Sequence, residues 1–142
     1  MRHIFASTSL ALSLAALLPA ANAADTRQLV EMPPPMQEHM LGNMRDHLVA
    51  LGEIQAALGK GDFDRASDIA EQRIGMSSLQ SHGASHMAPY MPKAMQDIGT
   101  NMHRAASRFA RTAQEGDGQK ALEDLALVTQ QCVACHAGYR VY

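Results

Sequence analysis

Hydrophobic positions recur at the spacing of an amphipathic helix in four segments of the chain. The first predicted helix lies within residues 32–61, because a proline cluster opens this segment and Gly59 and Gly61 close it. The second, residues 62–79, begins at Asp62, a residue type that caps helix N-termini well. The side chains expected to face inward from these two helices are Met36, Met40, Met44, Leu48, Leu51, Leu58, Phe63, Ala66, Ile69, Ala70 and Ile74.

A longer connection, residues 80–92, follows the second helix, since it holds one glycine and two prolines. The third predicted helix covers residues 92–114, the sequence EGDG breaks it, and the fourth runs from residue 119 through His136. Their expected inward side chains are Met95, Ile98, Met102, Ala106, Phe109, Ala113, Ala121, Leu125, Val128 and Cys132. No single helix can bury its own apolar stripe, so the pattern predicts an all-α fold, an antiparallel four-helix bundle.

The first 23 residues have the layout of a secretory signal peptide. Arg2 precedes an apolar run over residues 4–18, and the small residues Ala21 and Ala23 mark a cleavage site after Ala23. The apolar run is shorter than the ~20 residues that span a bilayer. We therefore expect a cleaved signal peptide, residues 1–23, and one domain, residues 24–142, in the periplasm of a bacterium.

Charge excludes one class of partner. Removal of Arg2 takes the formal net charge from −2 to −3, so the exported domain has no basic excess for nucleic acid. No second apolar stretch could cross a membrane, and we expect no membrane span after cleavage.

The two cysteines of the chain stand three positions apart near its C-terminus, and a histidine follows the second. On a helix, Cys132, Cys135 and His136 would present two thiols and an imidazole to one side. C-x-x-C-H is the attachment sequence of a c-type haem. A zinc site and a thioredoxin-like redox pair are the alternatives. The sequence has no second pair of ligands at the spacing of a zinc finger, as a zinc site would require. No strand of a βαβ unit precedes the motif, as a thioredoxin-like redox pair would require.

The closing sequence CVACHAGYR resembles that of the cytochrome c′ family of class II c-type cytochromes, C-x-x-C-H-x-x-Y-R, and matches it in full. The resemblance implies a four-helix bundle with one haem c per chain. It implies that Cys132 and Cys135 bind the haem covalently, that His136 is the proximal iron ligand and that Arg140 lies near the haem. It also implies a homodimer through the first two helices, where Gly42, Ala50 and Gly52 would permit close contact.

The same resemblance places Met40, in the sequence HMLGNM, on the distal side of the iron, with Met36 or Met44 as alternates one turn away. With a methionine ligand, the protein is expected to transfer single electrons between redox partner proteins of the periplasm. With a five-coordinate iron, it would instead bind NO or CO. We expect no enzyme, because no carboxylate pair or nucleophile constellation is visible; a weak peroxidase-like activity stays open.

Histidines outside the motif allow a further alternative. The loop HGASHMAPYM offers His82, His86, Met87 and Met91, donors that suit copper in an oxidising compartment. The other histidines, His39, His47 and His103, lie on predicted helices and are expected at the surface or its boundary. An imidazole from His39 or His47 could also reach the iron.

Overall fold

A computed structural model describes residues 24–142, and the predicted signal peptide, residues 1–23, lies outside the described residues. The described part is mainly helical, which confirms the all-α prediction. Its elements are β1 (Gln28–Leu29), α1 (Pro34–Leu58), α2 (Phe63–Ile69), α3 (Ala84–Met87), α4 (Lys93–Gln114), α5 (Gly118–Gly138) and β2 (Tyr139–Arg140). No helix within residues 24–142 has both the length and the apolar character to cross a membrane.

The helix boundaries follow local chemistry, and the proline start of α1 and the Asp62 cap are as predicted. Pro34 occupies the first turn of α1, where its missing N–H breaks no hydrogen bond. Asp62 caps α2 by accepting from the backbone N–H of Arg65 at 3.2 Å, and Asp117 caps α5 in the same way. Gly61 and Gly116 adopt φ values of 71° and 76° in the turns before α2 and α5, a conformation that glycine tolerates best.

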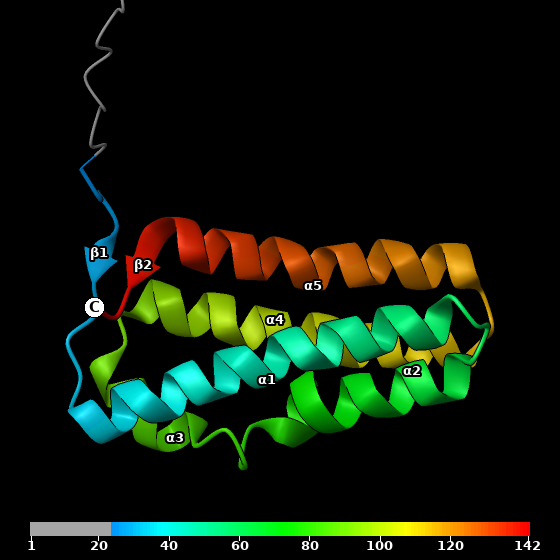
Figure 1. Cartoon of the computed structure of the whole chain (residues 1–142), viewed down its shortest axis with the longest axis horizontal. Coiled ribbons are helices and arrows are strands. Elements are labelled where there is room, and N and C mark those ends of the chain that lie inside the picture. Colours follow the sequence, from blue (N-terminus) through cyan, green and yellow to red (C-terminus); the bar gives the residue numbers. More distant parts are fainter. Residues whose placement is uncertain (1–23) are drawn as a thin grey trace, which may run out of the picture.

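The second helix is shorter than predicted. The α-helix ends at Ile69, a π-helical turn continues over Ala70–Ile74, and Gly75 then takes an extended conformation. A short 3-10 turn, Met76–Ser78, starts the connection to α4, and this connection contains α3. The returning segment therefore runs alongside only part of α1, and the connection covers the rest (Figure 1).

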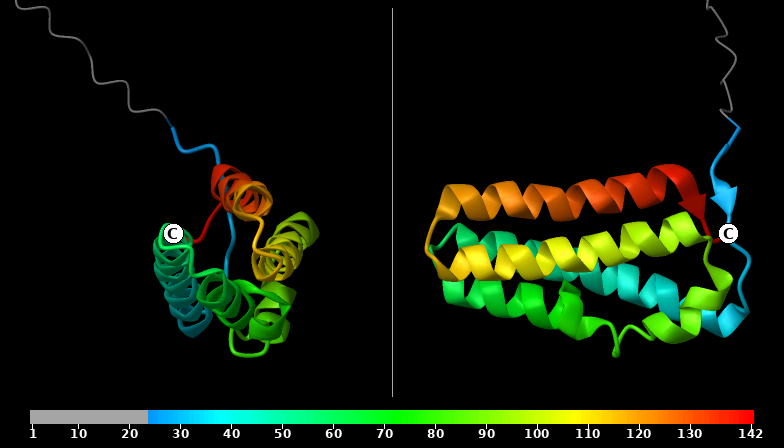
Figure 2. Two further views of the ribbon diagram at one scale, coloured as in Figure 1. Left: turned by 90° about the vertical axis from the view of Figure 1, so that its right-hand side faces the viewer. Right: turned by 180° about the vertical axis from the view of Figure 1, so that it is seen from behind.

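The long helices lie roughly side by side along the longest axis of the molecule (Figures 1 and 2). α4 packs against α5 and α2, and α1 packs against α2, whereas α1 and α5 touch little. The main core is rich in alanine, which lets the helix backbones approach closely, and its largest fully buried apolar side chains are Phe109, Ile54, Ile74 and Val128.

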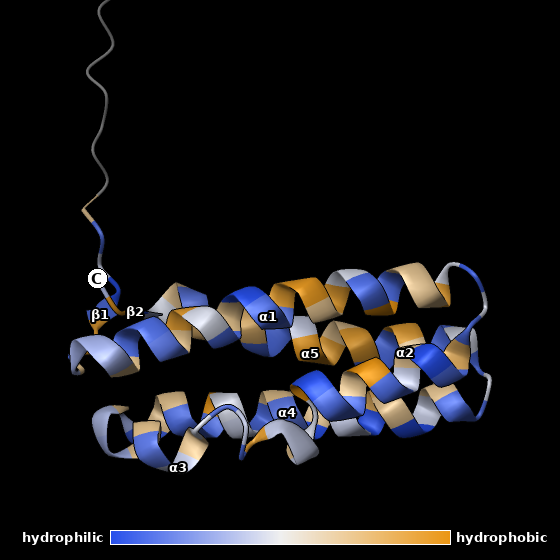
Figure 3. Cartoon of the chain, turned by 60° about the horizontal axis from the view of Figure 1, so that its bottom comes forward, coloured by the Kyte–Doolittle hydropathy of each residue, from blue (hydrophilic) through white to orange (hydrophobic). Residues whose placement is uncertain are grey.

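The buried side of α1 differs from the predicted methionine–leucine stripe. Leu48 is 72% exposed, and the buried positions are Met40, His47, Ala50, Ile54 and Ala57. Hydrophobic residues occur on several sides of this helix, and its ribbon changes repeatedly between hydrophobic and hydrophilic colours (Figure 3), so periodicity alone could not select the inner side. Ala50 belongs to the core, so it cannot contribute to the expected dimer contact; Gly52 is exposed.

A two-stranded parallel sheet joins the two ends of the described chain. Gln28 pairs with Tyr139 and Leu29 with Arg140, and the Val30 N–H donates to the Arg140 carbonyl at 2.8 Å. Val30 is 2% exposed beneath this pairing. The sheet was not predicted, because each strand is only two residues long. It lies at the end of the molecule where α5 terminates (Figure 1).

Candidate cofactor cavity

A cavity of about 610 Å³ opens between α1, α4 and the end of α5. It exists because α2 and its π-turn stop at Gly75, so only the connection before α4 closes this half of the molecule. Its volume lies within the ~300–1,000 Å³ range of small-molecule and cofactor sites. The wall is mainly apolar and contains six methionines: Met40, Met44, Met87, Met91, Met95 and Met102.

The C-x-x-C-H motif occupies the last two turns of α5. Cys135 and His136 line the cavity, and the His136 side chain is solvent-exposed. Cys132, one turn earlier, is half-buried against the main core, with its sulfur 3.5 Å from the Val128 carbonyl. Burial raises the pKa of both thiols, the opposite of the shift that a reactive dithiol requires.

Three methionines of α1 were candidates for the distal iron ligand, and they have different surroundings. Met40 is 7% exposed, lines the cavity and belongs to the same hydrophobic cluster as Cys135. Met36 packs at the edge of this cluster, outside the cavity wall. Met44 lines the cavity but is 36% exposed. Of the three, Met40 is thus the one that is both buried and on the wall.

Arg140 places a guanidinium group at the cavity wall. Its side chain lines the wall from β2, and its Nη1 donates to the Tyr142 carbonyl at 2.7 Å. Its Nε is buried without a hydrogen-bond partner and lies 3.6 Å from an Asp25 carboxylate oxygen. A guanidinium on the wall of an apolar cavity suits an anionic group of a ligand, such as a carboxylate of haem.

A cluster of three buried histidines forms the deeper wall of the same cavity. His47 comes from α1, His82 from the connection and His103 from α4, and their exposed fractions are 7%, 8% and 7%. The ring centroids of His47 and His82 lie 4.8 Å apart, those of His82 and His103 5.4 Å, and those of His47 and His103 5.9 Å. The expectation that His47 and His103 lie at the surface or its boundary is therefore wrong.

The sequence contains a weak signal for this cluster. His47 lies seven residues after Met40 and three before Ala50, which places it on the buried side of α1 once that side is known. The three histidines are otherwise far apart in the sequence, and only tertiary packing brings them together.

Buried surroundings favour the neutral form of the three imidazoles. Desolvation lowers the pKa of His47 to about 4 and lowers the pKa values of His82 and His103 as well. Nδ1 of His103 donates to the Ile74 carbonyl at 2.9 Å, which fixes its tautomer. Ser78 donates its hydroxyl hydrogen to the Gly75 carbonyl at 2.7 Å, so toward the histidines it can only accept.

The loop residues predicted as a copper set do not converge. His82 joins the histidine cluster and Met87 and Met91 line the cavity, but His86 is exposed and outside the wall. His39 also lies outside the wall, where its Nε2 donates to the His82 carbonyl at 3.0 Å. Within residues 24–142, no group of three or more His, Cys, Asp or Glu side chains is placed to hold a metal ion.

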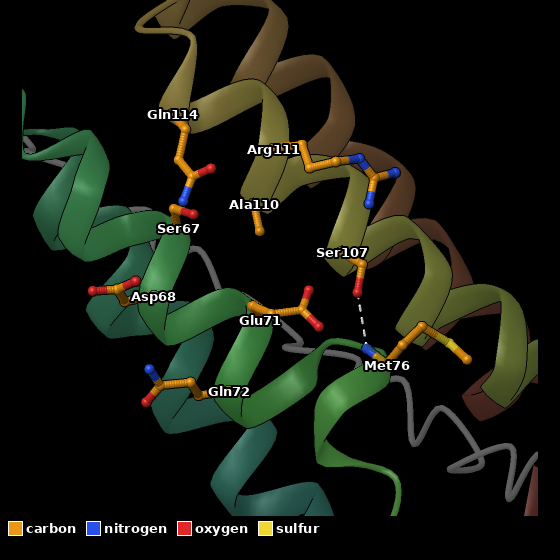
Figure 4. Close-up of a pocket in the computed structure, with 9 residues that line it drawn as sticks. All are labelled: Ser67, Asp68, Glu71, Gln72, Met76, Ser107, Ala110, Arg111 and Gln114. Carbon is orange, nitrogen blue, oxygen red and sulfur yellow. Dashed lines mark hydrogen bonds between the residues drawn. The ribbon is translucent and has the colours of Figure 1, made fainter.

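A second hollow, of about 460 Å³, lies between the second helix with its π-turn and α4 (Figure 4). Several of its polar groups are engaged locally. The Ser107 hydroxyl accepts from the Met76 N–H at 2.9 Å, and the Glu71 carboxylate accepts from the Ser77 N–H at 3.2 Å. These bonds hold the start of the connection in place and converge on no common point.

No protein-family model matches this chain, and no curated protein or solved structure matches it at a significant level.

Proposed function

We propose that the chain is an exported c-type cytochrome of the cytochrome c′ type, an antiparallel four-helix bundle that transfers single electrons between redox partner proteins of the periplasm. One haem c would be bound to Cys132 and Cys135, with His136 as an axial iron ligand. The observation that carries the proposal is that Cys135 and His136 of the only C-x-x-C-H motif of the sequence line a cofactor-sized, largely apolar cavity.

The residues around this cavity fit a haem. The methionines of the wall would exclude water from an apolar macrocycle, and the Arg140 guanidinium, which lines the wall, would bind one of its carboxylates. When bound, haem supplies one-electron redox chemistry, which no side chain of this cavity can provide. The chain itself provides the two thiols for attachment and the His136 imidazole for the iron.

Met40 is the residue that we assign to the distal side. It is buried in the wall and clusters with Cys135, whereas Met36 lies outside the wall. A thioether opposite a histidine raises the potential of haem iron, as an electron carrier requires.

The test begins with expression of the full chain, signal peptide included, in a host that matures c-type cytochromes. The purified protein should be coloured, should have a mass consistent with cleavage after Ala23 and one covalently bound haem, and should show a low-spin ferric spectrum. Met40→Ala should become high-spin and lose the near-infrared sulfur-to-iron band. Met36→Ala is the matched control, one turn away and outside the cavity wall, and should keep both features.

Two outcomes would change the assignment. A colourless product with the mass of the bare polypeptide would contradict the haem proposal. A high-spin ferric spectrum in the wild type, insensitive to Met40→Ala, would contradict methionine ligation. That spectrum would favour the alternative function, a five-coordinate haem protein that binds NO or CO.

A further inference from the structure

The histidine cluster is not required by a c-type haem attached through the C-x-x-C-H motif. It nevertheless places two imidazole nitrogens from different elements close together, His47 Nε2 and His82 Nδ1, at 3.4 Å. We propose that these two nitrogens bind one Cu(I) ion and that the thioether of Met44 completes the site. This second metal site uses no residue of the motif, and it does not depend on the haem being present.

The distance between the two nitrogens suits a shared metal ion better than a hydrogen bond. Imidazole nitrogens bind first-row metals at about 2.0–2.1 Å, so two of them on one tetrahedral or trigonal ion lie roughly 3.3–3.6 Å apart. An N–H···O hydrogen bond is shorter, about 2.7–3.2 Å, so the contact between the two rings is at best a long hydrogen bond. The two rings also face one another obliquely, with centroids 4.8 Å apart and planes 54° apart, so they are not stacked.

Neighbouring groups leave these two nitrogens without short hydrogen bonds. The only other contact of His82 Nδ1 is the Ser78 hydroxyl at 3.3 Å, and the hydrogen of that hydroxyl is already donated to Gly75. His103 uses its Nδ1 for the Ile74 carbonyl. The contacts that these two buried nitrogens make are therefore long, and a metal ion would bind both nitrogens at once.

The other side chains of the cavity select a soft metal. No Asp or Glu side chain is among the described residues that line it, while six methionines are. Thioethers and imidazoles prefer Cu(I), whereas carboxylate and water ligands suit harder ions. Met44 lies on α1 one turn before His47 and also lines the cavity, so its sulfur is on the appropriate side of the helix. A site of two imidazoles and one thioether requires no third His, Cys, Asp or Glu.

The proposed copper site and the proposed haem site occupy different parts of the cavity. His47 and Met44 lie seven and four residues after Met40 on α1, which separates them from Met40 by about 10 Å and about 6 Å along the helix axis. The backbone of His82 is held in position by α1, because its carbonyl accepts hydrogen bonds from Asn43 Nδ2 at 2.9 Å and from His39 Nε2. The position of the loop imidazole is therefore set before any metal binds.

The experiment titrates the purified exported protein with Cu(I) under anaerobic reducing conditions, in competition with a chromogenic Cu(I) chelator. We expect one equivalent of tightly bound copper. His47→Gln and His82→Gln should each weaken binding by more than about 100-fold, since the loss of a mere supporting partner already costs 10–100-fold. Met44→Leu should weaken it as well. His86→Gln is the matched control, an exposed histidine of the same connection, and should bind like the wild type.

The absorption spectrum of the haem provides a second readout on the same samples. If copper binds as proposed, His47→Gln and His82→Gln leave the haem spectrum unchanged; a changed spin state would place an imidazole on the iron and overturn the copper assignment. X-ray absorption at the copper edge of the wild type should report two nitrogens and one sulfur, which tests the site even if a variant fails to fold. The proposal is refuted if the wild type cannot compete with the chelator, if it takes Zn(II) in preference, or if His86→Gln alone loses the metal.

Discussion

Gly75 allows the second helix to end where the cavity begins, and its replacement by alanine provides a direct test of this geometry. A Cβ atom at this position would lie 2.7 Å from the Glu71 carbonyl oxygen and 2.8 Å from the Glu71 Cα. The Glu71 carboxylate, also at 2.7 Å, can rotate away, but the two backbone atoms belong to the π-turn and cannot. Gly75→Ala therefore forces the backbone itself to move.

The expected loss follows from the cost of overpacking, which is about 1–3 kcal/mol in a well-packed site. For a domain of this size, that corresponds to a fall in Tm of roughly 4–12 °C. The displacement would also reach the histidine cluster, because the Gly75 carbonyl accepts from the Ser78 hydroxyl and lies 3.2 Å from His103 Nδ1. Copper affinity should fall together with stability.

Gly52→Ala is the matched control. Gly52 lies in the middle of α1 on its exposed side, and a Cβ atom there would meet nothing within 4 Å. Alanine at such a position stabilises a helix by about 0.5–1 kcal/mol, so this variant should unfold at a higher temperature than the wild type. Thermal and urea unfolding, followed by circular dichroism at 222 nm, measure the stability of both variants. A Gly75→Ala protein as stable as the wild type would refute the proposed role of this glycine.

Three further substitutions test the register of α1 and the acid response. Ile54→Ala, at a fully buried position, should lower the free energy of unfolding by about 2–5 kcal/mol in urea titrations, whereas Leu48→Ala should change it by less than about 0.5 kcal/mol. Equal losses would mean that Leu48 faces the core, as the sequence predicted. Burial raises the pKa of Glu71, but hydrogen bonds from Ser107 and Ser77 outweigh it, so the folded-state pKa lies below the ordinary 4.5. A carboxyl group with a lowered pKa stabilises the fold above its ordinary pKa, and this stabilisation is lost as the pH falls. The stability advantage of the wild type over Glu71→Gln should therefore shrink below about pH 4.5 in urea titrations across the acid range. An advantage that grows there would contradict this sign.

Local signals in the sequence were sufficient for much of the helical architecture. Asp62 and Asp117 cap the helices that follow them, glycines at 61 and 116 make the turns, and the inward stripe of α4 was predicted correctly at Met102, among other positions. These features depend on residues within one or two helical turns of one another, which a sequence pattern can capture. The C-x-x-C-H motif has the same local character.

Long-range packing determines the features that local patterns could not predict: the inner side of α1, the cavity and the histidine cluster. The inner side of α1 is the side that packs against α2 and its π-turn. Ala50 and Ala57 are buried there because small residues allow close backbone approach, and Leu48 is left exposed. The cavity depends on the early end of the second helix, which a π-turn and the crowding at Gly75 impose. The histidine cluster depends on both, since His47, His82 and His103 come from three separate elements. Residues so distant in the chain become neighbours only when the whole core has formed, and no local pattern contains that information.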